Sequence, residues 1–514
     1  MAPRPQPRKL DPIAGSPPLL VHTCGLTLSP VKSASRELLD TLKHQCDCAP
    51  VSMGEYVASP RVAADLVRVF SESDGLLADR LEYGAMDVQL ADADAVVGAD
   101  TATGSVVGSM FTLTNTILGS GTLAVPFAIA SSGWVLGNAI MLAIALLTQY
   151  SVHLLLSASD RAGVQCAKTY ESLGHFTMGS FGSHLAEFTF IFGGFGTLVS
   201  YFVFITDLAA AVLGVDAAHK WLLTVGTVGL VVLPLSLSRR LGKLRLASVL
   251  AILAIGYVVS FVLVAYLATN YRATTEVSTP SGFRAVKFEP GSVYTVTLLI
   301  AAFACHNTAL PVYEELRSRS LPRMNRAVIG AIATAFLLYE TVAICGYLQF
   351  GDATRDNILL NFSPEYVEKH PSIAFPLLLG QLCMALALLL TAPIAMWPFR
   401  SCILSVYLRL KTGVQTPSHD ATHTEYVGVT VASQALILLC SIFVPSVKIP
   451  LSIVGSVSGS LLIFIMPALF FLLQSPGPLL ARNHIGPLLM LVAGVIVGVL
   501  GLSLTLYKIA HEHF

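Results

Sequence analysis

The sequence predicts an all-α membrane protein with eleven transmembrane helices. Its mean hydropathy is +0.70 and its charged fraction is 12%, about half the share that is usual in soluble globular chains. Apolar stretches of at least about 18 residues, enough helix to cross ~30 Å of hydrocarbon, recur along the chain. These observations exclude a soluble enzyme. The expected spans are 105–131, 134–157, 184–213, 220–237, 246–269, 291–315, 325–350, 372–397, 426–444, 448–473 and 484–507.

We expect the chain to have three parts, and the first of them is distinguished by its charge. Residues 1–104 hold 23 of the 62 charges, nine basic and fourteen acidic, and contain Pro-rich stretches such as "APRPQP". Such a composition favours a polar, largely disordered cytosolic tail. The transmembrane domain is expected over 105–507, followed by a short C-terminal tail over 508–514. The length of the N-terminal tail raises the possibility of a cytosolic partner.

Basic residues in the connections favour a cytosolic N-terminus. With the N-terminus inside, the inner loops hold fourteen Lys and Arg residues, and the outer connections with the C-terminus hold eight. Eleven spans then place the C-terminus outside the cell or in a lumen. The plasma membrane and a vacuolar or lysosomal membrane remain alternatives.

Enzyme and metal signatures are missing from the sequence. The nine cysteines are scattered without paired CxxC motifs, and neither GxSxG nor a set of histidine boxes occurs. We therefore expect no catalytic residue, cofactor or resident metal beyond a possible Na+, and no nucleic-acid partner. The expected surroundings are a lipid bilayer.

Two of the expected spans contain residues that interrupt a helix. These are Gly119, Ser120, Gly121 and Pro126 in the first span and His306, Asn307, Thr308 and Pro311 in the sixth. An unpaired backbone N–H or C=O in hydrocarbon has no water to bind, so an interruption is tolerated where it faces protein, a cavity or a ligand. Each freed group left empty costs about 1–3 kcal/mol. The alternative is a simple kink in each helix.

The two interruptions fall at matching positions if spans 1–5 and 6–10 form two repeats. Interrupted segments at corresponding places in two halves indicate a transporter binding site near the bilayer midplane. The sequence therefore predicts a five-plus-five inverted-repeat fold with discontinuous helices 1 and 6, followed by an eleventh helix.

Several motifs resemble the amino acid/auxin permease family and, within it, the sodium-coupled neutral amino acid transporters. They are "LTNTILGSGTLAVPFAIASSGW", "KTYESLGHFTMG", "FACHNTALPVYEELRSRSLPRMNRAV", "CGYLQFGDATRDNILLNFS" and "LLLTAPIAMWPFRSCI". The resemblance covers roughly 104–507. It implies a secondary active transporter that moves amino acids by alternating access.

The resemblance also implies a cation site. Its ligands would be Asn115 and Thr391, with backbone oxygens of Asn115 and Leu118. Hydroxyl, amide and carbonyl oxygens suit a hard cation without requiring a buried anion. The alternative is that Asn115 makes a hydrogen bond between helices and that Thr391 bonds within its own helix.

The amino acid is expected to bind between the two breaks. Its carboxylate would meet backbone amides around Ser120, Gly121 and Thr122, where glycine allows close approach. Its ammonium would face carbonyls of Cys305, His306, Asn307 and Thr308. Neither break contains an acidic side chain, which favours a neutral amino acid.

Either Na+ or H+ could drive such transport. Ionisable residues inside spans are rare and usually functional, and Glu340 and His306 are the candidates for a proton relay. Glu187 and Asp207 are expected to have structural partners instead. An alternative function is a membrane-embedded amino acid sensor that signals through the N-terminal tail.

Overall fold

The computed structural model describes residues 104–163, 169–237, 245–273, 284–413, 421–478 and 481–512. Apart from Gly104, the tail expected over 1–104 lies outside these ranges. All of the described residues belong to one compact unit. At the other end, the last helix continues to Glu512, into the segment expected as the C-terminal tail.

Regular structure in the described ranges is helical, apart from one isolated bridge between Gly104 and Leu316. The α-helices are α4 (Val106–Ile117), α5 (Gly121–Ser132), α6 (Trp134–Ala162), α7 (Tyr170–Met178), α8 (Ser180–Leu213), α9 (Lys220–Thr227), α10 (Leu233–Ser236), α11 (Arg245–Ala273), α12 (Val293–Ala302), α13 (His306–Glu314), α14 (Leu321–Phe350), α15 (Pro364–Lys369), α16 (Ala374–Thr412), α17 (His423–Phe443), α18 (Lys448–Val454), α19 (Met466–Gln474) and α20 (Arg482–Glu512). Two π-helical segments, η2 (Val228–Val232) and η9 (Gly455–Ile465), continue α9 and α18.

The described helices confirm the predicted all-α membrane class. Nine helical segments of the described ranges are long and apolar enough to cross a membrane, and the bent pair α4 and α5 makes a tenth. Two of the nine join shorter helices, α12 with α13 and α18 with η9 and α19. The expected fourth span, 220–237, corresponds to a shorter apolar helix from Lys220 to Ser236. Its π-helical turn and Pro234 interrupt regular α-helix within it. The count of eleven spans therefore stays a prediction.

The turn between α5 and α6 depends on Gly133. Its φ is +83°, a positive value that glycine adopts readily and residues with a Cβ atom rarely adopt. A Cβ atom at this position would lie 2.7 Å from the carbonyl oxygen of Arg284. Glycine therefore allows the two helices to follow each other directly.

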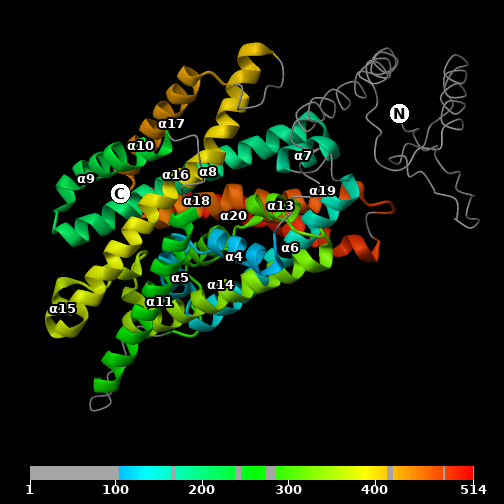
Figure 1. Cartoon of the computed structure of the whole chain (residues 1–514). Coiled ribbons are helices and arrows are strands. Elements are labelled where there is room, and N and C mark those ends of the chain that lie inside the picture. The colour runs from blue at the N-terminus through cyan, green and yellow to red at the C-terminus, as the bar shows by residue number, and fades with distance from the viewer. Residues whose placement is uncertain are drawn as a thin grey trace, which may run out of the picture. The chain divides into compact units, whose positions relative to one another are not determined.

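The helices pack in two groups that share a common core. Figure 1 shows α4, α5, α6 and α14 gathered together, and α8 beside α16, α9 and α17, as their contacts also indicate. The interrupted helix α12–α13 contacts both α5 and α6. This arrangement brings the two discontinuous helices into the interior of the first group.

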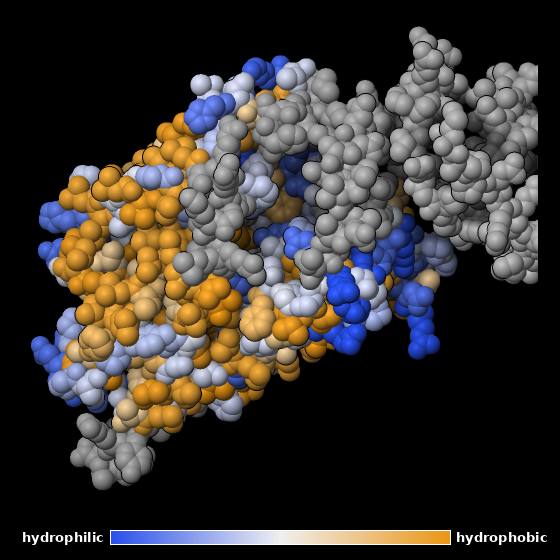
Figure 2. All heavy atoms as spheres, viewed as in Figure 1, coloured by the Kyte–Doolittle hydropathy of each residue, from blue (hydrophilic) through white to orange (hydrophobic). Residues whose placement is uncertain are grey.

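An apolar outer surface marks the lipid-facing side of the helices. Leu146, Leu253 and Leu337 are each more than half exposed. Figure 2 shows apolar side chains over the middle of one face and hydrophilic residues mostly toward its margins. Such a surface suits hydrocarbon and is unfavourable in water. It is the surface of a multi-pass membrane protein.

Two acidic residues inside the predicted spans form ion pairs. Arg409 of α16 donates to both carboxylate oxygens of Glu187 in α8, at 2.8 and 2.7 Å. The Nζ atom of Lys220 in α9 lies 2.9 Å from the Oδ1 atom of Asp207 in α8. These pairs confirm the prediction that both acids have structural partners, because each ties α8 to a neighbouring helix.

Candidate substrate and ion site

The first span is broken between Ile117 and Gly121. The two helix segments are bent by 61° at this point. Leu118 adopts an extended conformation with φ −74° and ψ 101°. Within the described part of the chain, the amides of Gly119, Ser120 and Gly121 donate no hydrogen bond. The predicted discontinuity of helix 1 is confirmed, and it leaves three N–H groups open at the start of α5.

The sixth span is broken between Ala302 and His306. The amide of Phe303 closes α12 by donating to the Leu299 carbonyl at 3.0 Å. Cys305, with φ −125° and ψ 4°, departs from helical geometry directly before α13. The predicted discontinuity of helix 6 is therefore also confirmed, but the residues expected to interrupt it, His306, Asn307 and Thr308, form the first turn of α13 instead, and the break lies directly before them.

Proline occupies the same position in both second half-helices. Pro126 is the sixth residue of α5, and Pro311 is the sixth residue of α13. Because proline has no N–H, the carbonyls of Thr122 and Asn307, four residues earlier, lose their regular donors. Each second half-helix thus begins with an additional open carbonyl, and the match supports two related halves.

A tyrosine joins the two breaks. The hydroxyl of Tyr339 in α14 lies 2.7 Å from the carbonyl oxygen of Ile117 and 3.2 Å from that of Ala302. These are the last residues of α4 and α12. Tyr339 is completely buried. The structure therefore brings the two predicted break regions into one place.

Close packing surrounds this junction. A Cβ atom on Gly121 would lie 2.9 Å from the Cβ of Ala302 and 3.4 Å from the Tyr339 hydroxyl. Glycine at this position thus has a packing reason, the approach of α5 to α12, besides the predicted approach of a ligand. In this conformation the two breaks are packed against each other.

A second contact links α4 to α13. The hydroxyl of Thr308 lies 3.2 Å from the Thr116 hydroxyl and 3.0 Å from the Cys305 carbonyl oxygen. The amide of Thr308 also donates to that carbonyl, at 3.2 Å. The Cys305 carbonyl, expected to face an ammonium group, is thus already an acceptor here. The Asn307 carbonyl, by contrast, lacks its regular helical donor because Pro311 has no N–H.

His306 is fully buried at the start of α13. Its Nε2 lies 2.8 Å from the Ser151 hydroxyl of α6, and that hydroxyl donates to the carbonyl of Ile463 in η9. A serine hydroxyl has one hydrogen, so it accepts from a protonated Nε2 of His306. The Nδ1 atom of His306 has no hydrogen-bond partner within the described ranges.

The residues expected to bind a cation lie on two helices. Asn115 is half-buried on α4, and its amide has no hydrogen-bond partner among the described residues. Leu118 is buried at the break. Thr391 of α16 donates to the Ala387 carbonyl of its own helix at 2.7 Å. No hydrogen bond joins Thr391 to Asn115, but the Thr391 oxygen keeps lone pairs for a cation.

The residues expected to bind substrate differ in exposure. Ser120, Thr122 and Cys305 are at most 5% exposed, whereas Asn307 is exposed. The Thr122 hydroxyl is enclosed beside the Tyr339 hydroxyl, while the Thr122 amide already donates to the Gly119 carbonyl at 3.2 Å. Gly119 and Ser120 therefore offer freer amides than Thr122.

Glu340 follows Tyr339 in α14 but lies about 100° around the helix from it. The residue is half-buried, and its Oε2 atom is enclosed without a hydrogen-bond partner in the described part of the chain. Ile344, one helical turn after Glu340 on the same face of α14, lines a separate cavity. An enclosed carboxylate oxygen without a partner is costly when the group is charged, so this surrounding favours a proton or a cation at Glu340.

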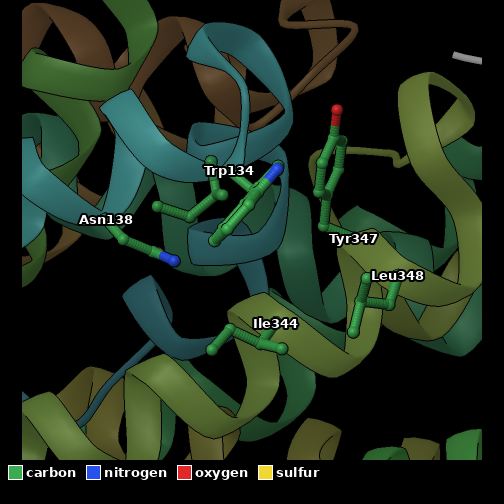
Figure 3. A pocket seen from close by; sticks show the side chains of 6 residues that line it. Trp134, Asn138, Ile344, Tyr347 and Leu348 are labelled. Carbon is green, nitrogen blue, oxygen red and sulfur yellow. The ribbon is translucent and has the colours of Figure 1, made fainter. Parts of the chain in front are cut away.

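Two cavities lie outside the breaks. Figure 3 shows the first, of about 200 Å³, toward which the Asn138 side chain of α6 points. It is lined by Ile129, Trp134, Asn138, Ile344, Tyr347 and Leu348. The second, of about 550 Å³, is lined by Asp160, Tyr313, Arg319, Ser320, Leu321 and Pro322. Neither is lined by a predicted site residue.

Tyr339 and Ser151 are the polar residues that sequence reasoning missed. Both lie inside apolar spans and resemble ordinary packing residues there. The available signal was the tyrosine hydroxyl itself, because a buried hydroxyl in a span needs an acceptor. The sequence did not show that this acceptor lies at the two breaks.

A helical membrane bundle with two interrupted helices packed at their breaks has the architecture of a secondary transporter. The family described as "Transmembrane amino acid transporter protein" matches residues 102–510. The chain belongs to this family, and the family predicted from the motifs is confirmed.

Curated and solved proteins share similarity with most of the chain. The sodium-coupled neutral amino acid symporter 2 of Danio rerio is 27% identical over 417 residues, which cover 76% of this chain and 79% of the relative. A solved Na+-coupled sialic acid symporter is 14% identical with a TM-score of 0.47, covering 85% of this chain and 97% of its own. MhsT in complex with L-phenylalanine is 12% identical with a TM-score of 0.48, covering 78% and 98%.

Proposed function

We propose that this protein is a secondary active transporter that moves neutral amino acids across a membrane by alternating access, with Na+ as the coupling ion. The observation that carries the proposal is the junction of the two breaks at Tyr339. Family membership supports amino acids as the substrate class, and the sodium-coupled relative supports the ion.

The substrate carboxylate would bind at the start of α5. The open amides of Gly119, Ser120 and Gly121 point to an anion, because the N-terminus of a helix carries a partial positive charge. The Thr122 hydroxyl, enclosed beside the Tyr339 hydroxyl, would be a further donor.

The substrate ammonium would bind carbonyls of the second break. Cys305, His306, Asn307 and Thr308 form this segment. The Asn307 carbonyl is its strongest candidate, since Pro311 cannot donate to it. Neither break contains an acidic residue that could pair with the positively charged side chain of a basic substrate, which favours a neutral amino acid.

We propose Asn115, Leu118 and Thr391 as the cation ligands. The Asn115 side chain lacks a partner among the described residues, and Leu118 lies where the α4 backbone becomes extended. These groups would offer only neutral oxygens, which suits a monovalent cation. With H+ as the driving ion, His306 and Glu340 would be the relay groups instead.

The proposed topology has a cytosolic N-terminus and the C-terminus outside the cell or in a lumen. The transmembrane domain would span 105–507, between a cytosolic tail at 1–104 and a short tail at 508–514. The membrane would be the plasma membrane or a vacuolar or lysosomal one. Labelling of single cysteines introduced on opposite connections, with a membrane-impermeant reagent, tests the orientation.

Uptake into proteoliposomes tests the function directly. Purified protein would receive a panel of labelled amino acids while the Na+ and pH gradients are varied separately. Accumulation of a neutral amino acid driven by a Na+ gradient supports the proposal. Accumulation driven only by a pH gradient would replace Na+ by H+. Binding without accumulation would favour the sensor instead.

A further inference from the structure

The carboxyl ends of two half-helices converge on one side chain. Ile117 ends α4 and Ala302 ends α12, and their carbonyl oxygens lie 2.7 and 3.2 Å from the Tyr339 hydroxyl. The carboxyl end of each helix carries a partial negative charge. Two such ends at one point create a place that attracts a positive charge.

The Tyr339 hydroxyl is enclosed with the two carbonyls and the Thr122 hydroxyl as its polar neighbours. The residue is 0% exposed, so water does not compete for it. Its ring packs edge-on against Phe303, which follows α12 directly, with ring centroids 5.2 Å apart and planes at 86°. The hydroxyl carries a single proton, which it gives mainly to the nearer carbonyl, that of Ile117.

We propose that the Tyr339 hydroxyl is a neutral placeholder for the positively charged cargo. In the empty transporter it lies between the terminal carbonyls of α4 and α12 and donates mainly to that of Ile117, and the coupling cation or the substrate ammonium binds these carbonyls in its place. This inference rests on the proposed function and assigns to Tyr339 a role in the return of the empty transporter. Tyr339 is thus a positioning residue that holds the ends of α4 and α12 in place when no cargo is bound.

The physical basis is a competition for the same acceptors. A carbonyl oxygen left without a donor in an apolar interior is costly, so removal of the hydroxyl raises the free energy of the empty state. The loaded state is affected less, because a charged group then fills the position. Loss of the hydroxyl should thus tighten cation binding and slow the release of the cation, the step that must precede return of the empty transporter.

The Tyr339→Phe variant tests this prediction because it removes the hydroxyl and keeps the ring. Net Na+-driven uptake requires return of the empty transporter, whereas exchange of labelled for unlabelled amino acid does not. With the best neutral amino acid of the panel, the ratio of exchange to net uptake should rise roughly two- to tenfold, the range expected for one hydrogen bond. The half-saturating Na+ concentration should fall.

Tyr347→Phe is the matched control. Tyr347 is also buried in α14, two turns later, and its hydroxyl accepts from the Arg284 amide at 3.0 Å, away from the breaks. This variant should keep the parental ratio of exchange to net uptake. A general loss of stability would reduce exchange and net uptake together.

A second measurement does not depend on transport. Na+-dependent thermal stabilisation of the purified protein should reach half its maximum at a lower Na+ concentration in Tyr339→Phe than in the parent. An unchanged or raised concentration, or equal losses of exchange and net uptake, would overturn the placeholder role. Absence of uptake by the parent protein itself would instead count against the proposed function.

Discussion

The Nε2 atom of His306 lies 2.8 Å from the Ser151 hydroxyl, which donates onward to the Ile463 carbonyl. These two contacts connect α13, α6 and η9 through one buried chain of hydrogen bonds. The chain holds the first residue of a second half-helix. It thereby fixes the position at which helix 6 resumes after its break.

We expect Ser151→Ala to destabilise the protein. The buried N–H of His306 would lose its acceptor, at a cost of about 1–3 kcal/mol. Thermal unfolding should occur at a lower temperature than in the parent. Ser157→Ala on the same helix is the control, because the Ser157 hydroxyl only donates to the His153 carbonyl within α6. Equal melting temperatures of Ser151→Ala and the parent would contradict the role of this chain.

His306→Gln separates the two coupling ions. Glutamine keeps a hydrogen-bond donor toward Ser151 but cannot carry a proton between states. With Na+ as the coupling ion, we expect the variant to retain Na+-driven uptake. Loss of pH-driven uptake, together with an unaffected Na+ response, would instead identify His306 as a proton relay.

The interruptions could be predicted from the sequence because local residues cause them. Gly119 and Gly121 weaken the first helix, and its break appeared where expected. The break of the sixth helix lies at 303–305, directly before the expected His306, Asn307 and Thr308, which begin α13. The expected first span, 105–131, also agrees closely with α4 and α5 together. Hydropathy and helix-breaking residues are sufficient for such features.

Features that depend on tertiary contact were not predictable in the same way. The role of Tyr339 requires that α14 pass both breaks, and nothing local to that tyrosine indicates this. Gly121 was predicted from ligand approach, but its contact with Ala302 gives it a packing role as well. Thr391 was assigned by family resemblance, and the structure shows its hydroxyl bonded within α16.

Asn115→Ala and Thr391→Ala test the proposed cation site. Each substitution removes one oxygen ligand, so the half-saturating Na+ concentration should rise roughly tenfold, as for loss of one contact to a charged group. Thr112→Ala is the control, since the exposed Thr112 of α4 bonds only within its own helix. Unchanged Na+ dependence in both variants, with normal amounts of protein in the membrane, would remove the assignment.

Gly121→Val probes the junction of the two breaks. A Cβ atom at this position already lies 2.9 Å from Ala302 Cβ, and the two methyl groups of valine add further overlap. We expect uptake to be abolished because α5 can no longer approach α12 and the amides of the first break are covered. Gly226→Val in α9 is the control, since a Cβ there meets nothing within 4 Å. Parental uptake by Gly121→Val would place the substrate site elsewhere and show that the close packing of α5 against α12 is not required for transport.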